Sequence, residues 1–128
     1  MKYSFSTISN RSFEDTIEHV TQELKEEGFG VLTEIDVKET LKKKLDVEFK
    51  KYRILGACNP EFAHKALQAE DKIGVMLPCN VIVEEHEDGQ VEVSAVDPVA
   101  SMQAVENKGL ADIAEEVKNR LKQVIERV

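Results

Sequence analysis

Several residue types are scarce in this sequence, and each scarcity argues against a class of partner. Tryptophan is absent and aromatic residues make up only 5% of the chain, which leaves few rings on which nucleic-acid bases could stack. The 17 lysine and arginine residues are outnumbered by 25 aspartate and glutamate residues, so the net charge is −8. Because phosphates and anionic lipids are bound by clustered basic side chains, we expect neither a nucleic-acid nor a membrane partner.

Cysteine and long apolar segments are scarce too. Cys58 and Cys79 are the only cysteines in the sequence. The longest apolar segment, residues 73–83, is too short to span a bilayer, and the N-terminus lacks the apolar core of a secretion signal. We therefore expect a cytoplasmic protein, in which both cysteines are free thiols rather than partners in a disulfide.

The established catalytic and nucleotide-binding motifs are also missing. The sequence contains no Walker loop, no GxGxxG, no GxSxG and no HExxH. The sequence therefore indicates no reaction and no particular cofactor. Whether the protein is an enzyme stays open, and we favour a non-catalytic role.

What the chain does contain is a clear succession of periodic segments. Its 128 residues, 41% of them apolar, fit one domain over residues 1–128. Alternating polar and apolar residues predict strands at residues 2–8, 29–37, 51–58, 73–85 and 91–96. Apolar residues at helical spacing predict helices at residues 13–27, 38–45, 60–67 and 110–128, with a helical turn after Asp97-Pro98. This order favours an α+β fold: a largely antiparallel sheet of about five strands with helices packed on one face and a long C-terminal helix.

Local signals refine these segments. The residues expected to cap helix ends are Ser12, Asp36, Asn59 and Gly28. Asp88-Gly89 predicts a hairpin turn between the last two strands. In the short helix after Asp36, Leu41 and Leu45 are expected to turn inward. Pro78 cannot donate to a strand ladder, so we expect it to break or bulge the strand at residues 73–85.

Two turns that pair a cysteine with an asparagine are the most suggestive feature. In Cys58-Asn59-Pro60, helix capping explains the asparagine and the proline. Cys58 stands just before a helix N-terminus, where the partial positive charge favours a thiolate, although it could equally be a small, buried and inert side chain. In Pro78-Cys79-Asn80, a strand irregularity would re-aim side chains. The strand–helix–strand passage between the turns could bring both thiols to the same end of the sheet.

Histidines add little to this picture. His64 lies about one turn into the helix that Pro60 opens, so Cys58, His64 and Cys79 together offer donors for a soft metal. Their spacing matches no zinc pattern, and we assign no metal. His19 and His86 are expected to be solvent-exposed.

The middle of the chain resembles the bacterial and archaeal domain-of-unknown-function family 302. The segments that carry the resemblance are residues 52–60, Ala63, Ala66-Leu67 and residues 73–83, with Gly28-Phe29, Val31, Asp97-Pro98, Met102 and Asn107 on the flanks. The resemblance covers nearly the whole chain and implies a compact α+β domain that forms homodimers in the prokaryotic cytoplasm. It implies no reaction, since the family has no agreed activity.

The leading hypothesis is a homodimeric, non-catalytic module that binds a small molecule or another partner where the two turns meet. The residues of this predicted site are Cys58, Asn59, Pro60, His64, Pro78, Cys79 and Asn80. One alternative is a thiol-dependent enzyme, or a sulfur- or redox-handling protein, with Cys58 as nucleophile and Cys79 as resolving thiol. Another is a plain oligomerisation module.

Overall fold

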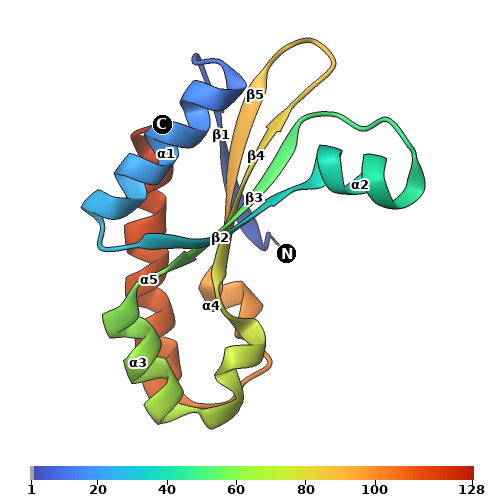
Figure 1. Cartoon of the computed structure of the whole chain (residues 1–128). Helices are drawn as coiled ribbons and strands as arrows, with labels where there is room; N and C mark the ends of the chain where they lie inside the picture. Colours follow the sequence, from blue (N-terminus) through green and yellow to red (C-terminus); the bar gives the residue numbers. More distant parts are fainter. Residues whose placement is uncertain (1) are drawn as a thin grey trace.

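The computed structural model describes residues 2–128, which form a five-stranded sheet and its surrounding helices (Figure 1). The strands are β1 (Ser4–Ser9), β2 (Gly30–Asp36), β3 (Tyr52–Cys58), β4 (Cys79–Glu85) and β5 (Val91–Val96). They lie in the order β1-β5-β4-β3-β2, and every neighbouring pair is antiparallel. The predicted α+β class with an antiparallel sheet is confirmed.

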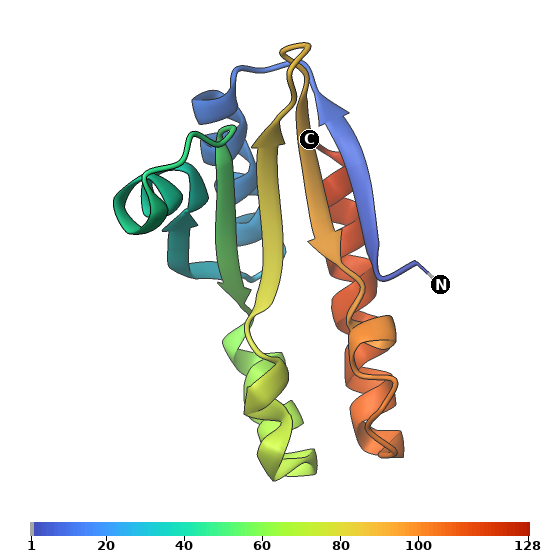
Figure 2. The same cartoon turned by 90° about the vertical axis from the view of Figure 1, so that its right-hand side faces the viewer.

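The helices are α1 (Phe13–Glu26), α2 (Val37–Leu45), α3 (Pro60–Ala69), the 3₁₀ helix η1 (Asp71–Met76), α4 (Pro98–Ser101) and α5 (Lys108–Glu126). Apart from α2, the helices fall into two groups. Helices α1 and α5 lie behind the sheet in Figure 2, whereas α3, η1 and α4 extend beyond its end, beside the N-terminal half of α5. Within residues 2–128, no helix is both long and apolar enough to cross a membrane.

The main hydrophobic core lies between the sheet and the two helices behind it. Val81 and Val83 of β4 and Val93 of β5 alternate toward this core, and Leu24 of α1 and Leu121 of α5 meet them. Burying one such side chain contributes about 1.5–3 kcal/mol to stability. This alternation explains the register, because a slip of one residue would turn the valines out to solvent.

A second, smaller hydrophobic cluster lies beyond the end of the sheet. Its buried members are Ala66 of α3, Ile73 of η1, Met102 after α4, and Leu110 and Ala114 of α5. Helix α5 therefore joins both clusters, its C-terminal half packing in the main core and its N-terminal half in the second cluster.

The predicted strand at residues 73–85 is wrong in its first half. Residues 71–76 form η1, in which Ile73 is buried in the second cluster and Val75 is 85% exposed. The pairing of Cys79 with Ala57 is the last between β4 and β3 at this end, so earlier residues have no strand to pair with. Pro78, which follows a cis peptide bond, therefore precedes the strand and does not bulge it. The register irregularity lies instead in β2, between Val31 and Thr33.

Two further expectations need correction. Helix α2 has no buried residue, and Leu45 is exposed, because this helix stands beside the β2 edge of the sheet and away from both clusters. The two histidines expected to be exposed are partly buried, because each is hydrogen-bonded by its Nε2: His19 with the Arg127 carbonyl at 2.7 Å, and His86 with Glu92 at 2.8 Å.

The predicted caps are confirmed. Ser12, Asp36 and Asn59 each accept a hydrogen bond from a backbone N–H in the first turn of the following helix. Gly28 follows α1 with a φ of +86°, a conformation that glycine adopts without steric cost. The last helix begins earlier than predicted, at Lys108, because Asn107 caps it through the Leu110 N–H.

Candidate functional site

A cavity of about 280 Å³ lies between the end of the sheet and the helices beyond it. It is lined by side chains from β2, β3, α3, α5 and the segments that precede β4 and follow β5. These are Phe29, Leu32, Thr33, Ala57, Cys58, Asn59, Phe62, Ala63, Ala66, Leu77, Pro78, Cys79, Pro98, Met102, Ile113, Ala114 and Val117. Because members of both hydrophobic clusters line it, the cavity lies at the boundary between them.

Backbone pairing and helix capping explain how the cavity is built. The register of β3 with β4 sets Ala57 beside Cys79, so the last residues of β3 lie next to the first residue of β4. Asn59 then starts α3 immediately, so Phe62 and Ala63 in its first turn face the strand ends. The small side chain of Ala63 leaves space that a larger residue would fill.

The β2 irregularity forms the outer wall of the cavity. The register shift between Val31 and Thr33 leaves Leu32 out of the regular alternation. Leu32 is 69% exposed and yet lines the cavity, so the cavity reaches the surface at this point. A bulge commonly re-aims side chains in this way next to a site.

Four of the seven residues predicted from the sequence line the cavity, namely Cys58, Asn59, Pro78 and Cys79. The other three do not. Pro60 and His64 are exposed on α3, and Asn80 is exposed on the opposite face of the sheet, where it pairs with Gly56. The structure therefore brings the two cysteine turns together but leaves His64 outside.

Both polar atoms of the Asn59 side chain form hydrogen bonds within the protein. Its side-chain oxygen accepts from the Phe62 N–H at 3.4 Å, and its amide nitrogen donates to the Glu27 carbonyl, also at 3.4 Å. The Arg120 guanidinium donates to that same carbonyl at 3.2 Å. Asn59 thus ties the end of α1 to the start of α3 and is buried in doing so.

The two thiols occupy different environments. Cys79 is buried, whereas Cys58 is only partly buried. Burial raises the pKa of the Cys79 thiol to about 11, and the nearby Cys58 adds to the rise. About one Cys79 in ten thousand is therefore ionised at pH 7, so this side chain forms an apolar part of the wall.

The cavity is suited to an apolar molecule. Among residues 2–128, no charged side chain lines it, and its few polar side chains are Thr33, Cys58, Asn59 and Cys79. A protein cavity of about 150 Å³ accommodates benzene, so this one has room for roughly ten non-hydrogen atoms. The smallest ligand sites in proteins start at about this size.

Sequence reasoning missed most of the wall. Leu32 and Thr33 owe their place to the bulge, which strand periodicity does not reveal. Ile113, Ala114 and Val117 belong to the apolar stripe of α5 that the sequence did predict. The small alanine side chains of α3 face this stripe, and they could have indicated a gap between the two helices.

The chain thus has an α+β fold with an apolar cavity at one end of its sheet, and its sequence matches a known family. Residues 5–128 match the family described as Domain of unknown function DUF302, and the chain belongs to this family. No curated protein matches it. A similar solved structure is the crystal structure of an uncharacterized conserved protein DUF302 from Bacillus stearothermophilus, with 28% identity and a TM-score of 0.92. The alignment covers 99% of this chain and 98% of that one.

Proposed function

We propose that this protein is a non-catalytic binding module whose cavity takes a small apolar molecule. The observation that carries the proposal is the cavity of about 280 Å³ with no charged side chain in its wall. Binding in such a site is driven by the removal of apolar surface from water. Thr33 and Cys58, at its edge, are the side chains that can orient a polar group of the ligand.

Binding is favoured over thiol chemistry by the environment of Cys79. A resolving thiol reacts as its thiolate, and burial, which raises the pKa of Cys79 to about 11, makes this thiolate scarce at neutral pH. In the first turn of α3, which follows Cys58, the Phe62 N–H already donates to the Asn59 side chain and is therefore not free for a Cys58 thiolate. The thiols thus contribute shape and polarizability to the wall.

The proposal includes a homodimer formed through the open face of the sheet. In the described part of the chain, this face has only α2 beside its β2 edge (Figure 2). Ile35 of β2 and Ile8 of β1 are 47% and 43% exposed, and Ile54 and Ile82 between them are partly exposed. A second copy would cover these side chains. Sedimentation equilibrium tests this part: wild type is expected as a dimer and Ile54→Lys as a monomer, and a monomeric wild type would contradict it.

Indole is a suitable probe of the cavity because the chain has no tryptophan to interfere with its fluorescence. For a ligand of roughly ten non-hydrogen atoms we expect a Kd of about 0.1–1 mM. In a ¹H–¹⁵N correlation spectrum, indole should shift the backbone amides of residues 57–63, 77–79 and 113–117. Shifts confined to the open face of the sheet, or no saturable shift at all, would contradict the proposed site.

A further inference from the structure

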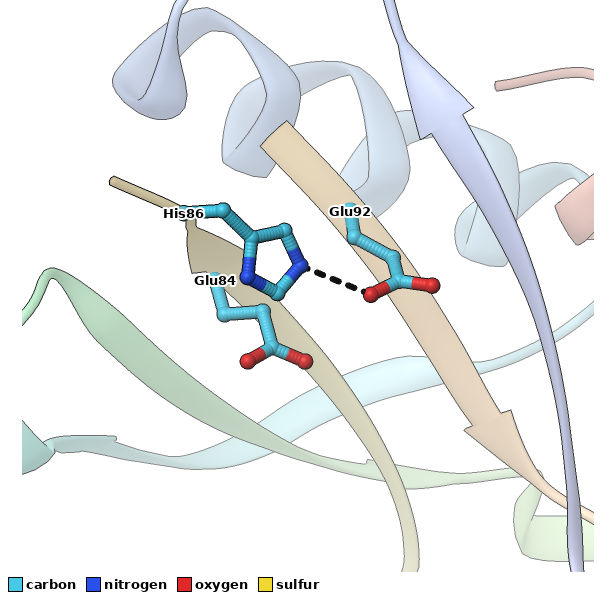
Figure 3. A group of neighbouring side chains, drawn as sticks. All are labelled: Glu84, His86 and Glu92. Carbon is cyan, nitrogen blue, oxygen red and sulfur yellow. Dashed lines mark hydrogen bonds and ion pairs between the residues drawn. The ribbon is translucent and has the colours of Figure 1, made fainter. Parts of the chain in front are cut away.

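A second group of side chains with ligand chemistry lies at the other end of β4. Glu84, His86 and Glu92 each point one donor atom toward a common centre, and these three atoms lie within 4.8 Å of one another (Figure 3). His86 Nε2 lies 2.8 Å from Glu92 Oε1. We call these three residues the hairpin site. Glu84 lies five positions after Cys79 along β4, roughly 17 Å away, so the hairpin site is distinct from the cavity.

The hairpin brings the three side chains together by simple geometry. Glu84 and His86 are two residues apart and therefore share a face. Glu92 of β5 is the direct cross-strand partner of Glu84. Two like charges directly opposite one another destabilise an antiparallel pair. The sheet therefore sets two carboxylates side by side at this point, and the Lys50 ammonium offsets the charge of only one of them.

The three groups are partly withdrawn from water. Their side chains are 13% (Glu84), 35% (His86) and 29% (Glu92) exposed. Partial burial weakens the screening of the two carboxylates by solvent. In a single chain it also leaves one open side, on the same face of the sheet as Ile8, from which an ion and its waters can approach.

We propose that the hairpin site binds one Zn²⁺ ion. An imidazole nitrogen with carboxylate oxygens is a donor set that zinc accepts, with metal–ligand distances of about 2.0–2.2 Å. Three protein ligands leave a fourth position for water. The imidazole favours zinc over magnesium, which prefers oxygen ligands alone. In the bound state the two flexible glutamate side chains would move the donor atoms, which already lie within 4.8 Å of one another, onto one ion.

Lys50 competes with the metal ion for the Glu84 carboxylate. Its Nζ lies 2.7 Å from Glu84 Oε1 and neutralises one of the two carboxylates. The second oxygen of Glu84 can still ligate, but the ammonium charge opposes the incoming cation. Removing that charge in Lys50→Met should therefore tighten zinc binding severalfold. A site in which Glu84 takes no part would not respond in this way.

The test is isothermal titration of Zn²⁺ into untagged, chelator-treated protein at about pH 7.5. Wild type is expected to bind one ion per chain, with little effect of excess Mg²⁺. His86→Gln and Glu92→Gln should each weaken binding at least about tenfold. Glu87→Gln is the matched control, because it removes one negative charge from the exposed part of the same hairpin and should leave the affinity within about twofold.

Several results would overturn the hairpin site. Absence of saturable zinc binding by wild type is one, and an equal loss in Glu87→Gln and Glu92→Gln is another, since it would indicate general attraction to negative charge. The absorption spectrum with Co²⁺ in place of Zn²⁺ shows whether a thiol binds the ion, since a sulfur-to-cobalt charge-transfer band would place the ion at Cys58. Thermal unfolding of each variant in chelator shows whether it folds. If His86→Gln does not fold, the zinc affinities of Glu92→Gln and Lys50→Met still test the hairpin site.

Discussion

Replacing Ala63 with leucine should stabilise the protein while weakening ligand binding. Ala63 lies in the first turn of α3, is only partly buried and borders the cavity. Leucine adds three carbon atoms that can occupy empty space of about 280 Å³ without displacing a neighbour. Both effects have one cause, because the side chain fills the volume that the ligand would use.

The size of the effect follows from the buried carbons. Three carbons at about 0.8 kcal/mol each give roughly 2.4 kcal/mol, and ordering the leucine side chain costs about 0.5–1 kcal/mol. The net stabilisation is about 1.5 kcal/mol. For a chain of this length, with an unfolding entropy of about 2.1 cal/mol/K per residue, the Tm should rise by about 5 °C.

Scanning calorimetry and indole titration together check this prediction. The control is Ala111→Leu, the same change at an exposed position of α5 that does not line the cavity. It should leave the indole affinity unchanged and move stability by about 0.5 kcal/mol or less. A lower Tm for Ala63→Leu, or an unchanged indole affinity, would refute the idea that Ala63 borders usable empty space.

Three other changes test the structure around the cavity. In Gly56→Ala, the added Cβ would overlap the hydroxyl of Thr33, so urea unfolding should show a loss of about 1–3 kcal/mol that Thr33→Ala partly restores. The buried Cys79 thiol stabilises the fold fully below about pH 9, and this contribution should be lost as the pH rises toward 11. In urea unfolding, the loss should be on the order of 2 kcal/mol relative to Cys79→Ala. Parallel pH profiles of the two proteins would contradict the raised pKa of Cys79. Asn59→Ala should cost about 1–2 kcal/mol, and the control Asn80→Ala, at an exposed position, about 0.5 kcal/mol or less, in the same assay.

The elements that the sequence predicted well are those determined by neighbouring residues. The apolar stripe of α5 and the alternation of β5 follow from the periods of helix and strand. The Asn59 cap and the Asp88-Gly89 turn depend on side chains within a few positions. Such features need no knowledge of the rest of the chain, and the largely antiparallel sheet was expected from the succession of these elements, whereas the order of its strands was not predicted.

The errors arose where distant pairing decides local structure. Ile73 and Val75 have strand-forming side chains, yet they lie beyond the last β3–β4 pair and form η1 instead. The exposure of Leu32 depends on a register shift against β3. The pairing of Glu84 with Glu92 could not be read from the Asp88-Gly89 dipeptide, because a two-residue turn there would set Glu84 opposite Val93. The hydrogen bond from the His86 N–H to the Gln90 carbonyl closes a three-residue loop instead, and this loop sets Glu84 opposite Glu92.

The division of the apolar interior into two clusters has a consequence for how a ligand reaches the cavity. The main core ties together all the hydrogen-bonded strands, whereas the second cluster is held by fewer buried side chains from α3, η1, α4 and α5. Local opening is least costly where few apolar contacts must separate. We therefore expect α3 and η1 to separate from the strand ends more readily than the strands separate from one another. Amide hydrogen exchange should accordingly be faster in α3 and η1 than in β4.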